Sequence, residues 1–209
     1  MQESQPRPTP AIQWLVWGAL ALVVAGIIFL YARERSAPPL PVISQVADFK
    51  LTDQLGNAVT LASLRGKTWV ADIIFTRCPG PCLQMTQRMQ ALQSALPPGV
   101  QLVSITTDPD FDTPPVLAKY AARFGAQSHR WTFLTGTRDQ VRTLAVDSLK
   151  LVLQDVPAAQ RTAENDLFIH STLFVVVDKA GRVRAALETE SADHLPRVLD
   201  TVRKLQRER

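Results

Sequence analysis

The hydrophobic residues of this chain form one long run near the amino terminus and a series of shorter runs farther along. Residues 11–32 contain no charged residue and are almost wholly apolar. A helix of this length can cross the hydrocarbon layer of a membrane, which is about 30 Å thick. Trp14 and Tyr31 lie near the two ends of the run, as is common for aromatic rings at membrane interfaces. We predict a single transmembrane anchor over residues 12–32.

A cleaved signal peptide is the alternative interpretation of this run. The apolar core of a signal peptide spans about 7 to 15 residues and ends at small residues. This run is longer and is followed by Arg33, Glu34 and Arg35. We therefore favour an uncleaved anchor, with a tail over residues 1–11 before it and a proline-rich linker over residues 33–44 after it. The flanking charges do not decide its orientation.

Residues 45–209 alternate short β-type runs with segments of helical periodicity, an order typical of an α/β domain with crossover helices. Buried strands are predicted over residues 68–75, 100–106 and 172–177, because these runs are continuous and rich in β-branched residues. Residues 182–187 follow a turn and are expected to form a hairpin with the last of these strands. Helices are predicted over residues 83–96, from a cap at Asp112 to Phe124, and over residues 137–147 and 192–206.

The composition agrees with one globular domain beside the anchor. The 209 residues are 46% hydrophobic and 20% charged, which excludes a disordered or collagen-like chain. The 23 basic and 19 acidic residues leave a net charge of +4 and are scattered along the sequence, so they do not indicate a nucleic-acid-binding face. The sequence therefore indicates a membrane, and no nucleic acid, as a partner.

Cys78 and Cys82 are the main candidates for chemistry. They enclose a Pro-Gly-Pro turn between a predicted strand and a predicted helix. The positive end of a helix favours the thiolate, which is both the nucleophile of disulfide exchange and the soft ligand that selects Cu(I). Three intervening residues favour metal binding over redox chemistry, and two inert buried cysteines remain the simplest alternative. A structural zinc site is disfavoured, because it needs four protein ligands.

Three histidines could add a metal ligand. His129 and His194 lie in polar segments and are expected at the surface. His170 lies between residues 154–166, which are polar and expected to form a surface loop, and a predicted buried strand. Its side chain could face the cysteine turn from the mouth of that strand. On these grounds alone, a purely structural role for His170 stays open.

Spaced motifs extend this pattern over about residues 46–188. They are residues 48–53 (DFKLTD), 64–67 (LRGK), 75–82 (FTRCPGPC), 108–114 (DPDFDTP), 134–136 (LTG), 170–172 (HST) and 177–181 (VDKAG). In this order they resemble the Sco/SenC family of membrane-anchored, thioredoxin-like copper proteins that help to assemble cytochrome c oxidase. The resemblance implies a thioredoxin-like α/β fold, with a central mixed sheet flanked by helices, on a single N-terminal transmembrane helix.

The resemblance also implies a function and a site. Cys78, Cys82 and His170 are the implied ligands of copper, as Cu(I) or Cu(II). The implied function is that of a metallochaperone that delivers copper to the copper-bearing subunit of cytochrome c oxidase. Other periplasmic copper chaperones and thioredoxin-like reductants are further expected partners. The amino terminus is expected in the cytoplasm, and the domain over residues 45–209 in the periplasm, outside the inner membrane.

A thiol:disulfide oxidoreductase is the alternative function, with Cys78 and Cys82 as its catalytic, redox-active pair. It would keep the cysteines of the oxidase copper site reduced. Asp72 lends it weight, because a buried acid in the strand before the motif resembles the proton-handling carboxylate of thioredoxins. A hydrogen-bonded structural aspartate is the plainer interpretation. A thiol peroxidase is disfavoured, because its peroxidatic motif is not evident.

Two positions depart from the family pattern. Gly80 stands where an acidic residue is common, and Arg77 stands where a histidine is often found. Both changes remove negative charge beside the expected metal, so copper affinity or partner choice is expected to differ. Four further candidate ligands have a structural interpretation as turn, cap or core residues: Asp108, Asp112, Met85 and Met89.

Overall fold

The computed structural model describes residues 10–35, 38–78, 80–156, 168–170 and 172–208. The chain divides into two compact units, Met1–Pro39 and Leu40–Arg209.

The first unit holds helix α1 (Pro10–Arg35). Its segment Gln13–Leu30 is long and apolar enough to cross a membrane. The predicted N-terminal apolar helix is therefore present. A signal sequence would meet the same criterion, so the anchor over residues 12–32 stays a prediction.

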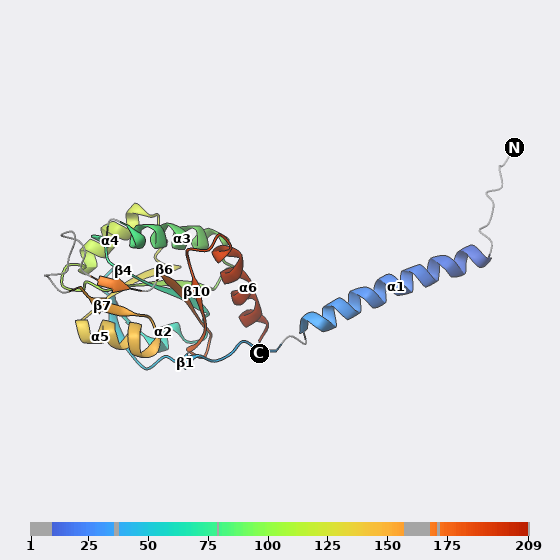
Figure 1. Ribbon diagram of the computed structural model, residues 1–209, viewed down its shortest axis with the longest axis horizontal. Helices are drawn as coiled ribbons and strands as arrows, with labels where there is room; N and C mark the ends of the chain where they lie inside the picture. The colour runs from blue at the N-terminus through green and yellow to red at the C-terminus, as the bar shows by residue number, and fades with distance from the viewer. Residues whose placement is uncertain (1–9, 36–37, 79, 157–167, 171, 209) are drawn as a thin grey trace. The chain divides into compact units, whose positions relative to one another are not determined.

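The second unit is built on an eight-stranded mixed sheet (Figure 1). Its strands are β1 (Ser44–Gln45), β2 (Lys50–Asp53), β3 (Ala58–Thr60), β4 (Trp69–Ile74), β5 (Gln101–Thr106), β6 (Trp131–Thr135), β9 (Leu173–Val177) and β10 (Arg182–Glu188). Their order across the sheet is β1-β10-β9-β4-β5-β6-β2-β3, in which β4, β5 and β6 are parallel. The three predicted buried strands correspond to β4, β5 and β9, and the predicted hairpin partner corresponds to β10.

Helices cover both faces of this sheet (Figure 1). One face carries α3 (Pro81–Ala95), α4 (Pro114–Arg123) and α6 (His194–Arg207), and the other carries α2 (Leu61–Leu64) and α5 (Arg138–Arg142), which continues as a π-helix over Thr143–Ser148. Successive side chains of a strand point to opposite faces. Val70 and Ile74 of β4 accordingly belong to the first core cluster, and Ala71 and Ile73 to the second. This two-sided burial holds β4, which leads to the cysteines, in the centre of the fold.

The predicted helices are present, with one correction. Asp112 was expected to cap the helix that ends near Phe124, but the N-cap of α4 is Thr113. Asp112 instead accepts hydrogen bonds from Thr76 and Thr106, at the ends of two neighbouring strands. The cap prediction is wrong because the carboxylate of Asp112 is already hydrogen-bonded to these donors at the ends of β4 and β5.

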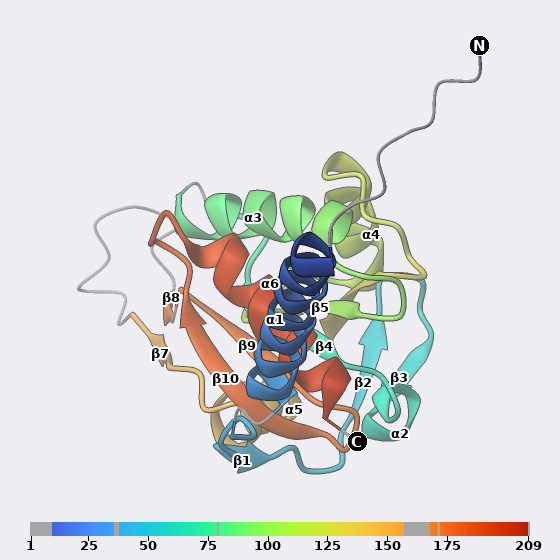
Figure 2. The same ribbon diagram turned by 90° about the vertical axis from the view of Figure 1, so that its right-hand side faces the viewer.

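The segment predicted as a surface loop begins in a strand. Strand β7 (Leu153–Asp155) pairs antiparallel with β8 (Phe168–His170) in a separate two-stranded sheet (Figure 2). Residues 157–166 of the predicted loop lie outside the described residues.

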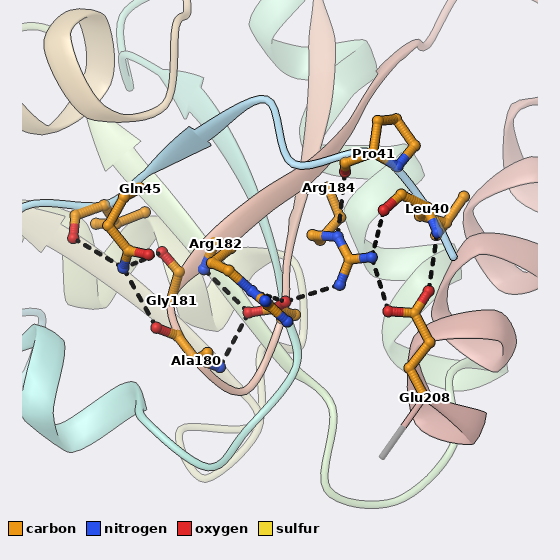
Figure 3. A network of polar contacts seen from close by, with 10 residues as sticks. Leu40, Pro41, Gln45, Ala180, Gly181, Arg182, Arg184 and Glu208 are labelled. Carbon is orange, nitrogen blue, oxygen red and sulfur yellow. Dashed lines mark hydrogen bonds and ion pairs between the residues drawn. The ribbon is translucent and has the colours of Figure 1, made fainter. Parts of the chain in front are cut away.

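A buried arginine fastens the start of the second unit to its end (Figure 3). The side chain of Arg184, which is 3% exposed, makes ion pairs with Asp178 at 2.9 Å and with Glu208 at 2.7 Å. Its guanidinium also donates to the backbone carbonyls of Leu40 and Pro41, and Glu208 accepts a hydrogen bond from the Leu40 amide at 2.9 Å. A buried guanidinium needs such partners. The compact unit therefore begins within the segment predicted as a linker.

Candidate metal centre

Cys78 and Cys82 flank the turn between β4 and α3. After the last residue of β4, the chain turns so that the Cys78 amide donates to the Phe75 carbonyl at 3.2 Å. Pro81 is the first residue of α3, where its missing N–H would have no helical acceptor. α3 begins two residues before the start predicted at residue 83, so Cys82 lies in the first turn of the helix and not in the turn before it. Figure 2 shows the first turn of α3 and β8 on the same side of the domain.

Both cysteines are in the thiol form and are hydrogen-bonded to each other. Cys78 is half-buried and Cys82 is buried. The hydrogen bond with Cys78 and burial among apolar side chains raise the pKa of the Cys82 thiol well above its usual range, and the charge of Asp72 acts in the same direction. The helix end was expected to favour thiolate. At Cys82 in the reduced chain, the hydrogen bond with Cys78 and burial instead raise the pKa and outweigh the backbone hydrogen bond of Phe75, which lowers it.

Helix α4 supports the first turn of α3 through two hydroxyl groups. Thr86 donates to the Cys82 carbonyl at 2.8 Å, and its hydroxyl lies 2.8 Å from that of Tyr120. Burial raises the pKa of Tyr120, which keeps this phenol protonated. The contact fixes the backbone of the cysteine helix against α4.

Asp112 holds the residues that precede Cys78. Its buried carboxylate accepts hydrogen bonds from the Thr76 amide at 3.0 Å and from the hydroxyls of Thr76 and Thr106. Burial raises the pKa of Asp112, although these hydrogen bonds act in the opposite direction. Asp112 thus ties the end of β4 to the end of β5 and fixes the start of the cysteine turn.

The charge of Arg77 is offset by the loop that holds Asp112. Its Nη2 lies 2.6 Å from Oδ2 of Asp108, whose side chain is 5% exposed. The guanidinium carbon lies 4.1 Å from the centre of the Phe111 ring, which is within the range of a cation–π contact. Arg77 was expected to remove negative charge beside the metal, but Asp108 compensates it. The structural interpretation of Asp108 is confirmed.

Asp72 is a buried, hydrogen-bonded aspartate, as the plainer prediction states. The Ser104 hydroxyl donates to Asp72 at 2.6 Å, and the indole N–H of Trp131 donates to the Ser104 oxygen at 2.9 Å. The charge of Asp72 also raises the pKa of Cys82 and of Tyr120. The carboxylate is therefore electrostatically coupled to the cysteine turn, and its role in proton transfer stays a prediction.

The other candidate ligands lie apart from the cysteines or in the core. Met85 and Met89 are fully buried in the core cluster beneath α3, which confirms their structural interpretation. His129 is exposed, as predicted. His194, at the start of α6, is half-buried, and its Nδ1 lies 2.9 Å from the Ser191 carbonyl.

His170 is the last residue of β8, where it pairs with Leu153. Its side chain lies outside what the structure describes. Among the residues that are described, no group of three or more histidine, cysteine, aspartate or glutamate side chains could hold a metal ion. The cysteine pair is therefore the described part of the candidate centre, and the role of His170 as a ligand stays a prediction.

Three polar residues that support the site were not predicted: Thr76, Thr86 and Tyr120. A threonine at the end of an apolar strand, two residues before a cysteine, is a local signal that could have indicated Thr76. Tyr120 reaches the site from a helix far along the chain, and no local pattern indicates it.

Comparisons with known proteins agree with this architecture. The SCO1/SenC family profile matches residues 41–206. The SCO1 protein homolog of Bacillus subtilis is 32% identical over 77% of this chain and 83% of its own length. The structure of BsSco, described as a member of the Sco family of cytochrome c oxidase assembly proteins with a disulfide switch, is 29% identical, with a TM-score of 0.66 over 80% of this chain and 98% of that one.

The structure of yeast Sco1 with copper bound is 26% identical, with a TM-score of 0.63 over 77% of this chain and 89% of that one. Sco structures have a thioredoxin-like fold, which confirms the predicted fold class. The family match spans nearly the whole of the second unit and includes both cysteines and His170. This chain belongs to the SCO1/SenC family.

Proposed function

We propose that this chain is a copper metallochaperone that delivers the metal to the copper-bearing subunit of cytochrome c oxidase during assembly. The observation that carries the proposal is the pair of hydrogen-bonded thiols at the start of α3, in a chain of the SCO1/SenC family. Two relatives support it: yeast Sco1 has been solved with copper bound, and BsSco belongs to a family of cytochrome c oxidase assembly proteins.

In this proposal, Cys78 and Cys82 supply two thiolates and His170 supplies a neutral imidazole. Thiolates are soft ligands that select Cu(I), and imidazole also suits Cu(II). Three protein ligands leave room for a further ligand from the acceptor. Copper can then pass by ligand exchange, without release of the free ion.

The proposal includes a location. The apolar helix α1 anchors the chain in the inner membrane, with the amino terminus in the cytoplasm and the domain in the periplasm. Other copper chaperones that load the site, and thioredoxin-like reductants that keep its thiols reduced, would meet the domain there.

A second function is favoured by the hydrogen bond between the two thiols and by the disulfide switch of BsSco. As a thiol:disulfide oxidoreductase, Cys78 and Cys82 would pass two electrons and two protons to a disulfide of the acceptor and become a disulfide themselves. A thioredoxin-like reductant would restore the dithiol. This reaction does not require His170.

Copper titration distinguishes the two functions. The reduced chain is expected to bind about one copper ion, and the oxidised chain none, because a disulfide sulfur no longer offers a thiolate lone pair. His170→Ala is expected to lose the thiolate-to-Cu(II) charge-transfer band and to keep Cu(I) binding, because two thiolates satisfy Cu(I). The Cys78–Cys82 disulfide should form at an unchanged rate.

His194→Ala is the matched control, because this histidine bonds to its own turn. Oxidase assembly in cells should fail with His170→Ala and Cys78→Ser and should proceed with His194→Ala. If His170→Ala supports normal assembly whereas Cys78→Ser does not, copper delivery through these three residues is wrong and the oxidoreductase function replaces it. If the oxidised chain binds copper with unchanged affinity, the ligands lie elsewhere.

A further inference from the structure

Thr189 connects the cysteine helix to the strand that follows His170. Thr189 comes directly after β10 and is fully buried. Its amide donates to the Thr172 carbonyl at 3.1 Å, and its hydroxyl donates to the same carbonyl at 2.8 Å. The Thr189 oxygen accepts a hydrogen bond from Nη1 of Arg88 at 3.1 Å. Arg88 lies in α3, whose first turn holds Cys82.

The hydroxyl group of Thr189 both donates and accepts a hydrogen bond. A hydroxyl has one proton, which goes to the Thr172 carbonyl, and oxygen lone pairs, one of which accepts from Arg88. A hydrogen bond from an ionised guanidinium is stronger than one between neutral groups. The bond from the Thr189 amide also extends the hydrogen-bond ladder between β9 and β10 by one residue. Glu188 pairs with Leu173, and the Thr189 amide donates to Thr172, the residue before Leu173.

We infer that Arg88 and Thr189 are positioning residues that hold the chain next to His170 in place relative to the cysteine helix. The inference rests on the proposed function, in which His170 is a copper ligand. Cys82 and Arg88 belong to one helix, and a single residue separates Thr172 from His170. Arg88, Thr189 and the Thr172 carbonyl therefore form a hydrogen-bonded relay between the two halves of the site.

A positioning role for Arg88 and Thr189 predicts a selective effect on Cu(II) binding, which a role in the stability of the fold alone does not predict. Cu(I) needs the two thiolates, whereas the Cu(II) signature also needs the imidazole. Loosening the chain beside His170 should therefore weaken Cu(II) binding and leave Cu(I) binding in place. Loss of fold stability would weaken both.

Thr189→Val removes the hydroxyl and keeps the shape and the backbone amide, and Thr189→Ser is the matched control that keeps the hydroxyl. In the copper-free full chain in detergent, Thr189→Val is expected to speed amide hydrogen exchange in the peptide around Thr172. Its Cu(II) affinity should fall about tenfold, as is usual when a group that orients a ligand is removed, with Cu(I) affinity within about twofold of wild type. Thr189→Ser should match wild type in all three measurements.

Arg88→Gln is a second test. Arg88 is half-buried, whereas Thr189 is fully buried, so this substitution changes no side chain of the core. It should reproduce the selective loss of Cu(II) affinity. If the wild-type charge-transfer band depends on His170, yet Thr189→Val and Arg88→Gln keep Cu(II) affinity, the relay is refuted. Equal losses of Cu(I) and Cu(II) affinity would also refute it. If His170→Ala leaves the band intact, the proposed function fails first and the relay fails with it.

Discussion

Asp112 binds donors from two strand ends, and two of these donors belong to Thr76, which lies just before the cysteine turn. A carboxylate has two acceptor oxygens, whereas an amide has one oxygen and an NH₂ group that donates. An asparagine at this position would remove acceptor capacity and add two N–H protons, so the buried donors would outnumber the acceptors. The shape of the cysteine turn depends on this carboxylate, which no local pattern distinguishes from a helix cap.

Asp112→Asn is expected to lower the free energy of unfolding by about 2 kcal/mol, because it leaves a buried donor unsatisfied. Urea unfolding of the reduced chain at neutral pH measures this change. Asp110→Asn in the same loop is the matched control, since its side chain is 68% exposed and pairs with Arg138, which is 57% exposed. Exposed ion pairs contribute less than about 1 kcal/mol. Equal losses in the two variants would contradict the role assigned to Asp112.

At the scale of elements, the β9–β10 hairpin is organised by Asp178. Its carboxylate accepts hydrogen bonds from the amides of Ala180 and Arg182 and from the side chains of Arg182 and Arg184. Burial alone would raise the pKa of Asp178, but these hydrogen bonds outweigh burial and hold the pKa below its usual value. The hairpin therefore depends on an ionised Asp178.

The pH dependence of stability follows from the direction of this shift. Asp178 in the folded chain has a pKa below its unfolded value of about 3.9. Its stabilising contribution is complete above that value and is lost as the pH falls through the folded pKa. Asp178→Asn is expected to lower the free energy of unfolding at neutral pH by about 3 kcal/mol, because it breaks a buried ion pair. It should also lose less additional stability than wild type when the pH falls below 4, a range that covers both pKa values.

Unfolding curves at several pH values measure this effect. Asp200→Asn is the control, because Asp200 and Lys204 form an exposed pair on α6. If wild type and Asp178→Asn lose stability in parallel on acidification, the ionised carboxylate does not stabilise the hairpin.

The sequence predicts those helices and strands that form because of the residues within them, without help from distant segments. Strands β4, β5 and β9 are continuous apolar runs, and a strand in the centre of a sheet needs such a run. Strand β6 was not predicted, because its five residues include two threonines and its pairing with β5 and β2 is set by distant residues. The cysteine pair was predicted from its motif. Asp112 and Tyr120 orient it through Thr76 and Thr86, which lie more than 30 positions away from them, and sequence periodicity carries no information about such contacts.

At the scale of the whole molecule, the point where the chain leaves the domain is fixed. Leu40 is bonded to Glu208, near the end of α6, and to Arg184. The first residue of the second unit is therefore held by a buried ion-pair network. The proposed location places this domain on the periplasmic side of the inner membrane.

The final prediction concerns this topology. A carboxy-terminal alkaline phosphatase fusion is expected to be active, and a reporter that works only in the cytoplasm should be inactive at the same point. Leu22→Arg together with Ile27→Arg is the control, because each charge near the helix centre costs about 2.5 to 3.5 kcal/mol for insertion. This double variant should lose phosphatase activity.

The active fusion should remain in the membrane at full length, because an anchor is kept whereas a signal peptide is removed. An inactive phosphatase with an active cytoplasmic reporter would reverse the orientation, and with it the compartment in which Cys78 and Cys82 could meet the oxidase.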